Sequence, residues 1–211
     1  EDFKYSIDEK GLKIEFTFVN GEHTFSPTLL VEKKDFFSFS HLSKEQLSLL
    51  VFNMGMVELI SYWKAFCSPR VIIKPYALKE EQIDFYKKLY YNGLGEFFYI
   101  NKIDADISSF MDIVSMGEAI IPEGEKVSGN KNLISIGGGK DSVVSLETLS
   151  ERKEDNFCYI INPDEATKAT AKMGGYKDDK IIAVKRGLDR KIVDLNSQGF
   201  LNGHTPFSAI V

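Results

Sequence analysis

The feature that most constrains the fold of this chain is a glycine-rich turn at residues 137–142, set between a strand pattern and a helix pattern. The run before it, residues 133–136, is short, mostly apolar and carries two β-branched isoleucines, which is typical of a buried parallel strand. In residues 143–149 apolar side chains recur at every third position, which is a helical spacing. The sequence therefore predicts a strand, a turn of glycines and a helix.

The turn has the chemistry of a phosphate site. Without a Cβ, the backbone of glycine can enter positive φ and approach a ligand closely. Successive amides, together with the free N–H groups of the following helix, form a positively polarised nest for phosphate. We therefore expect Gly137, Gly138 and Gly139 to hold phosphate groups. Lys140 adds a mobile positive charge and Ser142 adds a hydroxyl donor.

Two widespread phosphate-binding motifs do not match this turn. A Walker P-loop requires Ser or Thr after its Lys and a glycine further upstream, but Asp141 follows Lys140 and Ile134 occupies the upstream position. The dinucleotide fingerprint fails too, because its third glycine position is Ser142. The alternative to a nucleotide site is a glycine-rich turn without a ligand.

Residues 138–142, Gly-Gly-Lys-Asp-Ser, resemble the SGGxDS motif of the PP-loop ATP pyrophosphatases, with Gly137 where that motif has Ser. The resemblance implies an enzyme that splits ATP between its α and β phosphates and uses AMP to activate a carbonyl or carboxylate oxygen. Asp141 is then the candidate ligand for Mg²⁺, which prefers carboxylate and phosphate oxygens. Its alternative role is that of an acid at a helix start.

The composition is that of a globular protein. With 211 residues and 43% hydrophobic content, the chain can bury a sizeable core and fits one large or two small domains. The formal net charge of -5 gives no general attraction to nucleic acid, so we expect no such partner. The longest apolar run, residues 47–63, is interrupted by Asn53, Gly55 and Glu58 and therefore predicts a buried helix and no membrane span.

The cysteines and the two ends of the chain add further expectations. Cys67 and Cys158 are far apart and have no metal-ligand spacing, so neither a zinc site nor a disulfide framework is indicated. We expect Cys158 in the core and the protein in a reducing, cytoplasmic compartment. The chain begins with Glu1 in place of Met and stops at Val211, so we expect a processed or truncated start and a further C-terminal part.

The N-terminal part predicts a β-hairpin. Residues 12–19 alternate between apolar and polar side chains, as a half-buried antiparallel strand requires. Asn20 and Gly21 supply turn residues, and residues 24–31 can return as the second strand.

Two helices are predicted after the hairpin. Ser43 and Gln46 form a capping box that begins a helix running to about residue 66. In that helix Glu58 lies on an apolar face, where a paired structural carboxylate is favoured over a catalytic one. Residues 80–91 predict the second helix, and the aromatic residues at 90–99 favour packing over stacking on a base.

Strands and helices alternate in the C-terminal part. Apolar runs at 157–161 and 181–184 are strand patterns, and helix starts follow them at Asn162, the expected N-cap, and at Asp189. This order predicts a parallel sheet with right-handed crossovers, whose ligands lie at the carboxyl ends of the strands. The glycine turn, Asn162 and residues 185–186 would then share one rim, the alternative being ordinary caps and solvated charges.

These patterns together predict an α/β chain. We expect an α+β N-terminal region with a hairpin and two helices at residues 1–115, followed by a linker or surface loop at 116–131. The resemblance implies that residues 132–211 form a parallel, three-layer PP-loop sheet of the HUP-like, Rossmann type.

The tail, residues 195–210, adds a second polar turn that contains Asn202-Gly203-His204. Together with residues 58–64, 92–99 and 137–142, it resembles the ATP-dependent UDP-N-acetylmuramoyl-L-alanyl-L-glutamate epimerases of bacterial peptidoglycan synthesis, along most of the chain. Members of that family are longer than this chain. The resemblance implies inversion of the terminal L-glutamate to D-glutamate, with ATP converted to AMP and pyrophosphate in the presence of magnesium.

The resemblance also assigns roles to residues. ATP would be held by the residues of the turn and by the cap after the next strand: Gly137, Gly138, Gly139, Lys140, Ser142 and Asn162. Lys140, Asp141 and His204 would be catalytic. For His204 the reason is an unperturbed pKa near neutrality, which suits a proton carrier or a hydrogen-bond donor to the substrate, although a histidine in a turn is more often structural. Asp141 would hold Mg²⁺.

Other functions and the assembly state stay open. Another PP-loop adenylating enzyme, such as an amidotransferase-type ligase or a tRNA-modifying enzyme, would share the turn. A non-catalytic nucleotide-binding module would share it as well. The sequence also leaves open whether the chain forms a homo-oligomer.

Overall fold

One mixed β-sheet runs through the part of the chain that the computed structural model describes, residues 2–34, 38–120, 129–201 and 203. Its strands, in spatial order, are β1 (Asp2–Asp8), β2 (Gly11–Asn20), β4 (Thr28–Glu32), β11 (Ile181–Gly187), β10 (Asn156–Ile161) and β9 (Asn132–Ser135), and β3 (His23–Phe25) pairs with β2. β9, β10 and β11 pair in parallel, as the sequence predicts.

The sheet as a whole is not the parallel one that was expected. β4 pairs antiparallel with β11, with Val31 opposite Val184, and β1 to β4 pair antiparallel among themselves. The hairpin strand occupies the edge of β11 where a further parallel strand would lie. The chain is α/β, as expected, but its sheet is mixed and mostly antiparallel because the N-terminal strands join it. The division into two domains stays a prediction.

The predicted hairpin is confirmed, with two differences. Its return is split into β3 and β4 at Ser26 and Pro27, since a proline cannot donate to the ladder; instead its carbonyl accepts the N–H of Phe16 at 3.0 Å. Strand β1 was not predicted, and it pairs with the whole first half of β2. The alternating apolar side chains of β2 are buried, as expected: Leu12, Ile14, Phe16 and Phe18.

The predicted helices are also confirmed. α1 (Lys44–Trp63) begins with the capping box, in which Ser43 accepts from the amide of Gln46 and Gln46 accepts from that of Ser43. α2 (Glu80–Gly93) follows, and a short α3 (Gly95–Ile100) contains part of the aromatic segment. Two further parallel ladders pair β5 (Arg70–Ile73) with β7 (Asp112–Ser115) and β6 (Tyr76–Ala77) with β8 (Ala119–Ile120). Strand β8 thus lies in the segment predicted to be a linker.

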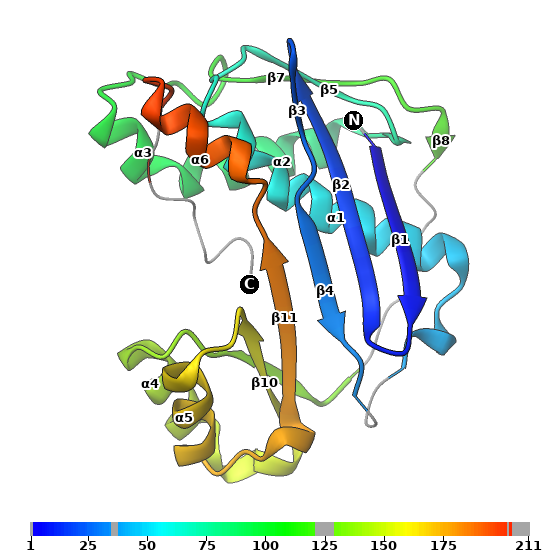
Figure 1. Ribbon diagram of the computed structural model, residues 1–211, viewed down its shortest axis with the longest axis vertical. Coiled ribbons are helices and arrows are strands. Elements are labelled where there is room, and N and C mark those ends of the chain that lie inside the picture. The colour runs from blue at the N-terminus through cyan, green and yellow to red at the C-terminus, as the bar shows by residue number, and fades with distance from the viewer. Residues whose placement is uncertain (1, 35–37, 121–128, 202, 204–211) are drawn as a thin grey trace.

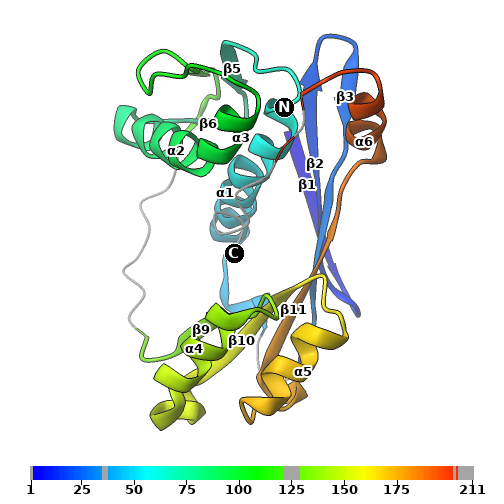
Figure 2. The same ribbon diagram turned by 90° about the vertical axis from the view of Figure 1, so that its left-hand side faces the viewer.

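The elements form two regions that β11 connects (Figures 1 and 2). One region contains α1, α2, α3 and α6 (Arg190–Ser197) with the antiparallel strands, and the other contains α4 (Lys140–Thr148) and α5 (Glu165–Met173). Each has its own apolar core. Among the described residues, no helix is both long and apolar enough to cross a membrane.

The smaller core lies between β9, β10 and the helices α4 and α5. Leu146 of α4 and Ala171 of α5 pack on the same cluster as Cys158 and Ile160, so both helices cover the same face of β10. The thiol of Cys158 is fully buried, as predicted, and burial raises its pKa to about 11. Helix α6 packs on the larger core, so the expected three layers do not arise from these helices.

Candidate functional site

The glycine turn has the conformation that its sequence suggests. Gly138 has a φ of +78°, in the left-handed region that favours glycine. At Gly137 and Gly139 no atom of the described residues, apart from the adjacent residues in the chain, lies within 4 Å of the position that a Cβ would occupy. Within the described part of the chain, the turn is therefore open on that side. Gly139 precedes α4 without a side-chain cap, which leaves the first amides of the helix for another acceptor. This arrangement fits a phosphate group.

Ser142 closes the turn from inside. Its side chain is buried, and its Oγ accepts the N–H of Gly137 at 2.9 Å. The hydroxyl hydrogen keeps its ability to donate. Lys140 and Asp141 are exposed in the first turn of α4. Ser142 thus holds the turn in shape, while Lys140 and Asp141 face solvent.

The predicted Mg²⁺ site depends on Asp141 alone. Within the described residues there is no group of three His, Cys, Asp or Glu side chains that could hold a metal ion. Mg²⁺ commonly keeps several waters and is bound through one or two carboxylates plus phosphate oxygens. A single exposed carboxylate beside a phosphate-binding turn fits that pattern, whereas a metal site made of protein ligands alone does not.

Asn162 continues the sheet beyond the end of β10. Its backbone has a φ of +49°, and its N–H donates to Val184 at 2.7 Å. Its side-chain amide accepts the N–H of Arg186 at 2.7 Å and donates to the carbonyl of Arg186 at 3.1 Å. The amide therefore makes the two bonds to Arg186 that the backbone of a continued parallel strand would make.

The predicted cap of α5 is off by two residues. Asp164, and not Asn162, is the N-cap: its Oδ1 accepts the N–H of Thr167 at 2.8 Å, and the Thr167 hydroxyl accepts the N–H of Asp164 at 3.0 Å. Asn162 cannot serve because its amide is bonded to the backbone of Arg186. These bonds to Thr167 lower the pKa of Asp164.

The cap makes α5 sensitive to acid. Because the pKa of Asp164 is below its ordinary value of 3.8 in the folded state, its contribution to stability is present above that value and is lost as the pH falls through the folded pKa. We expect amide protection in α5 to fall in this acid range, as hydrogen exchange would show. Asp164→Asn, which caps without titrating, should remove the pH dependence of that protection. An unchanged dependence in this variant would contradict the assignment.

A buried ion pair lies where β11 meets α1. The guanidinium of Arg186 donates to both oxygens of Glu58, each at 2.8 Å, and to the hydroxyl of Ser61 at 2.9 Å. The side chains of Arg186 and Glu58 are 7% and 2% exposed. Burial raises the pKa of Glu58, and the charge of Arg186 opposes that shift. Glu58 is thus a paired carboxylate, as predicted. The sequence indicated Arg186 only as a residue at the end of a strand and did not identify it as the partner of Glu58.

Three of the four stretches that carry the family resemblance meet at the end of α1. The amine of Lys64 donates to the carbonyl of Gly203 at 2.5 Å. Gly203 in turn lies against α3, because a Cβ there would be 2.9 Å from the ring of Phe97. Burial lowers the pKa of Lys64, and the nearby charge of Arg186 lowers it further. His204, the next residue, lies outside the described residues.

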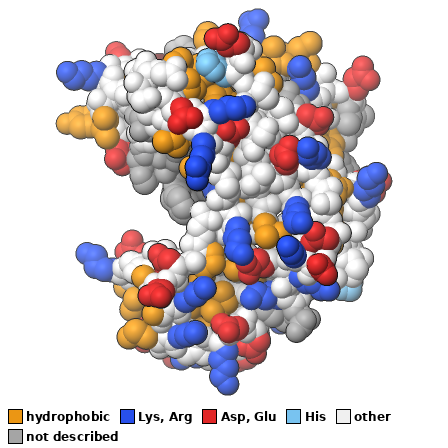
Figure 3. Space-filling model, viewed as in Figure 1, with side chains coloured by type: hydrophobic (Ala, Val, Ile, Leu, Met, Phe, Trp, Pro, Cys, Tyr) orange, Lys and Arg blue, Asp and Glu red, His pale blue; other side chains and the backbone are white. Residues whose placement is uncertain are grey.

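The fourth stretch, the glycine turn, lies across a hollow from these. Figure 3 shows the hollow between the two regions of the molecule. In Figure 1 β10 points toward it, and β9 is parallel to β10. The glycine turn and Asn162 follow the carboxyl ends of these two strands and therefore lie on the side of the hollow, as the strand order predicts.

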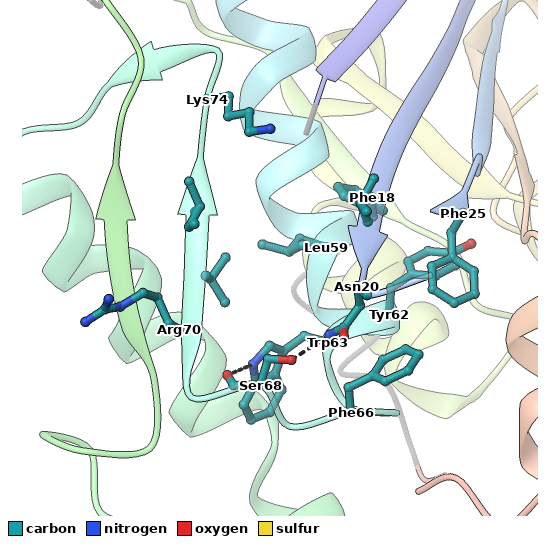
Figure 4. Close-up of a pocket in the computed structure, with 14 residues that line it drawn as sticks. Phe18, Asn20, Phe25, Leu59, Tyr62, Trp63, Phe66, Ser68, Arg70 and Lys74 are labelled. Carbon is teal, nitrogen blue, oxygen red and sulfur yellow. Dashed lines mark hydrogen bonds between the residues drawn. The ribbon is translucent and has the colours of Figure 1, made fainter. Parts of the chain in front are cut away.

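A separate cavity of about 320 Å³ lies beside α1 (Figure 4). Five of the fourteen residues that line it are aromatic: Phe18, Phe25, Tyr62, Trp63 and Phe66. Ser68 bridges its wall, accepting from Asn20 at 2.5 Å and, through its carbonyl, from the indole of Trp63 at 2.8 Å. No residue of the glycine turn lines this cavity, so its chemistry is distinct from that of the turn.

Comparisons with known proteins identify relatives. A UDP-N-acetyl-alpha-D-muramoyl-L-alanyl-L-glutamate epimerase from Salinispora tropica is 32% identical over 151 residues, which cover 72% of this chain and 32% of that protein. Proteins of the same name from Xanthomonas oryzae pv. oryzae and a Micromonospora species are 32% and 31% identical over 152 and 153 residues, again 72% of this chain and 32% and 33% of theirs. The matched part thus spans about a third of each relative.

No solved structure matches the chain. The family model described as the MurL N-terminal domain matches residues 1–211. That match covers the glycine turn, the Arg186 ion pair and the polar tail together. The chain therefore belongs to the MurL N-terminal domain family.

Proposed function

We propose that the protein is an ATP-dependent epimerase that inverts the terminal L-glutamate of UDP-N-acetylmuramoyl-L-alanyl-L-glutamate, and that this chain contributes its nucleotide-binding turn. The observation that carries the ATP part is the open glycine turn, with Gly138 in the left-handed region and α4 uncapped behind it. The names of the relatives support the substrate.

Activation by ATP solves a charge problem in the proposed reaction. A free carboxylate resists loss of the adjacent α-proton, because the product would carry further negative charge. In the proposed first step, a carboxylate oxygen of glutamate attacks the α-phosphorus of ATP, and the bond to the β-phosphate oxygen breaks to release pyrophosphate. The acyl-adenylate has lost the carboxylate charge, and its carbonyl can accept electron density from the α-carbon.

Two proton transfers and a hydrolysis would complete the reaction. A general base removes the α-proton, and an acid returns a proton to the opposite face of the α-carbon, which inverts the centre. Water then cleaves the acyl-adenylate and releases AMP and the D-glutamate carboxylate. His204 is the proposed proton carrier because of its ordinary pKa near neutrality.

The residues of the turn have distinct proposed roles. The amides of the glycines and the Lys140 amine would hold the phosphates and stabilise charge on the departing pyrophosphate, while Ser142 keeps the turn closed. Asn162 would border the same site. Asp141 would hold Mg²⁺, which supplies positive charge at the phosphates when bound.

The decisive experiment measures nucleotide products in the full-length protein. With ATP, Mg²⁺ and UDP-N-acetylmuramoyl-L-alanyl-L-glutamate, we expect AMP, pyrophosphate and a D-glutamate-containing product. The matched control substrate, which ends at L-alanine, should give no AMP. Release of ADP, or AMP release without the glutamate, would contradict the proposal. AMP release with unchanged stereochemistry would indicate another adenylating enzyme, and ATP binding without AMP a non-catalytic module.

A further inference from the structure

Arg186 connects three elements that are far apart in the sequence. It belongs to β11, its backbone is bonded to the amide of Asn162 after β10, and its guanidinium is bonded to Glu58 and Ser61 of α1. The guanidinium and the Glu58 carboxylate are both buried, so the position of this residue is strongly restrained. Because the backbone of Arg186 is bonded to the amide of Asn162, a restraint on the position of Arg186 also restrains the turn that contains Asn162.

That turn packs on the glycine turn. Two residues after Asn162, Asp164 begins α5 and binds Thr167. The position that a Cβ would take at Gly138 is 3.5 Å from the methyl group of Thr167 and 3.6 Å from its backbone nitrogen. The first turn of α5 therefore forms one wall of the glycine turn, at the residue with positive φ.

The contacts thus form a continuous path across the molecule. It runs from Glu58 to Arg186, through the amide of Asn162, to the cap of α5 and then to Gly138. Its first link is charge-assisted and bidentate, the strongest kind of hydrogen bond in proteins, and its second replaces a rung of the sheet. Neither link uses atoms of the glycine turn itself.

The geometry points to Arg186 as a positioning residue that sets the affinity of the glycine turn for ATP, acting through Asn162 and the start of α5. The inference rests on the proposed function for the identity of the nucleotide. It assigns Asn162 an indirect role: its amide orders the wall of the site. Nucleotide affinity therefore depends on a contact with α1, which lies in the other region of the molecule (Figure 2).

Three variants of the full-length protein test this. Asn162→Gly keeps the left-handed backbone and deletes the amide. Arg186→Lys keeps the charge and the backbone bonds to Asn162 but loses the fork on Glu58. Asn132→Ala is the matched control: it removes an amide bond of 2.8 Å to Asn156 at the opposite ends of the same strands.

The measurements are the dissociation constant of ATP by calorimetry, without the UDP-sugar, and the KM for ATP and kcat. We expect Asn162→Gly to weaken ATP binding by about fivefold to tenfold, the range of one or two lost hydrogen bonds, and to raise the KM in parallel. The ratio kcat/KM for ATP should fall with the affinity, because it contains the cost of ordering the turn around the phosphates. Asn132→Ala should leave the dissociation constant of ATP and the KM for ATP unchanged.

The remaining variants separate positioning from direct contact. If Asn162 touched the nucleotide itself, Arg186→Lys would leave the affinity for ATP unchanged, which would overturn the inference. We expect Arg186→Lys to weaken ATP binding. The double variant, Asn162→Gly with Arg186→Lys, should bind ATP no more weakly than Asn162→Gly alone, because Arg186 acts through Asn162. Equal weakening by Asn132→Ala would also overturn it, since the effect would then be general destabilisation.

Failure of the proposed function gives a different result. If the unsubstituted protein binds ATP but releases no AMP with the UDP-sugar dipeptide, the epimerase proposal fails, and the binding constants alone still decide the role of Arg186. If the unsubstituted protein binds no ATP, both proposals fail.

Discussion

Asp141→Asn is expected to reduce turnover by about a hundredfold or more, the usual size of losing one group that stabilises transition-state charge. Asp141 is exposed in the first turn of α4, two residues after the last glycine of the turn, where a carboxylate can reach a metal ion bound to phosphates. The free energy of unfolding should fall by only about 0.3–1 kcal/mol, since the variant loses no more than the attraction of its charge to the helix start. Steady-state rates and urea unfolding measure the two effects separately.

The control for this prediction lies on the same helix. Glu147→Gln removes an equal charge from an exposed position of α4, one residue before the helix ends, and should leave turnover unchanged. Raised Mg²⁺ concentrations should partly restore turnover in Asp141→Asn and have no effect on Glu147→Gln. If Asp141→Asn loses stability alone and keeps its turnover, Asp141 is a helix-start acid without a metal role.

The sequence predicted those elements whose signals are local. The capping box of Ser43 and Gln46 spans four consecutive positions, and the structure shows both of its hydrogen bonds. A strand pattern, three glycines and a helix pattern lie within seventeen consecutive residues, 133–149. The structure has a strand, a turn and a helix there, in the same order. Local hydrogen-bonding chemistry decides such features, so they can be predicted from neighbouring residues.

Pairings between distant segments could not be predicted in this way. Nothing in the pattern of β4 specifies that Val31 lies opposite Val184, because an antiparallel neighbour and a parallel one accept the same side chains. The mixed sheet, and with it the junction of the two regions, therefore escaped prediction. Asn162 illustrates the same limit: as a side-chain type it suits an N-cap, but its amide was already bonded to a strand residue 24 positions away.

One signal in the sequence did contain information on a distant contact. Glu58 lies in an apolar helix face, and a buried carboxylate requires a charged or hydrogen-bonding partner. The requirement is clear from the sequence, but the identity of the partner is not, since Arg186 is 128 positions away. Arg186, near the end of a strand that begins with four apolar residues, is the matching half of that signal.

Glu58→Ala is expected to lower the free energy of unfolding by about 3–5 kcal/mol, the cost of leaving a buried charge without its partner. Among the side chains of the described residues, the guanidinium of Arg186 would keep only the hydroxyl of Ser61 as an acceptor, and it has little access to water. Urea unfolding monitored by circular dichroism measures this loss. The matched control is Glu32→Ala, which breaks the ion pair with Lys185, the residue next to Arg186.

Exposure decides the difference between the two ion pairs. Lys185 and Glu32 are 63% and 29% exposed, so water replaces the lost partner and the expected loss is below about 1 kcal/mol. Equal losses in the two variants would contradict the burial of the Glu58 pair. A second variant, Glu58→Met with Arg186→Met, removes both charges of this buried pair and should recover much of the stability that Glu58→Ala loses. If ATP binding stays weak in that stable double variant, the pair serves the site through its geometry and not through overall stability.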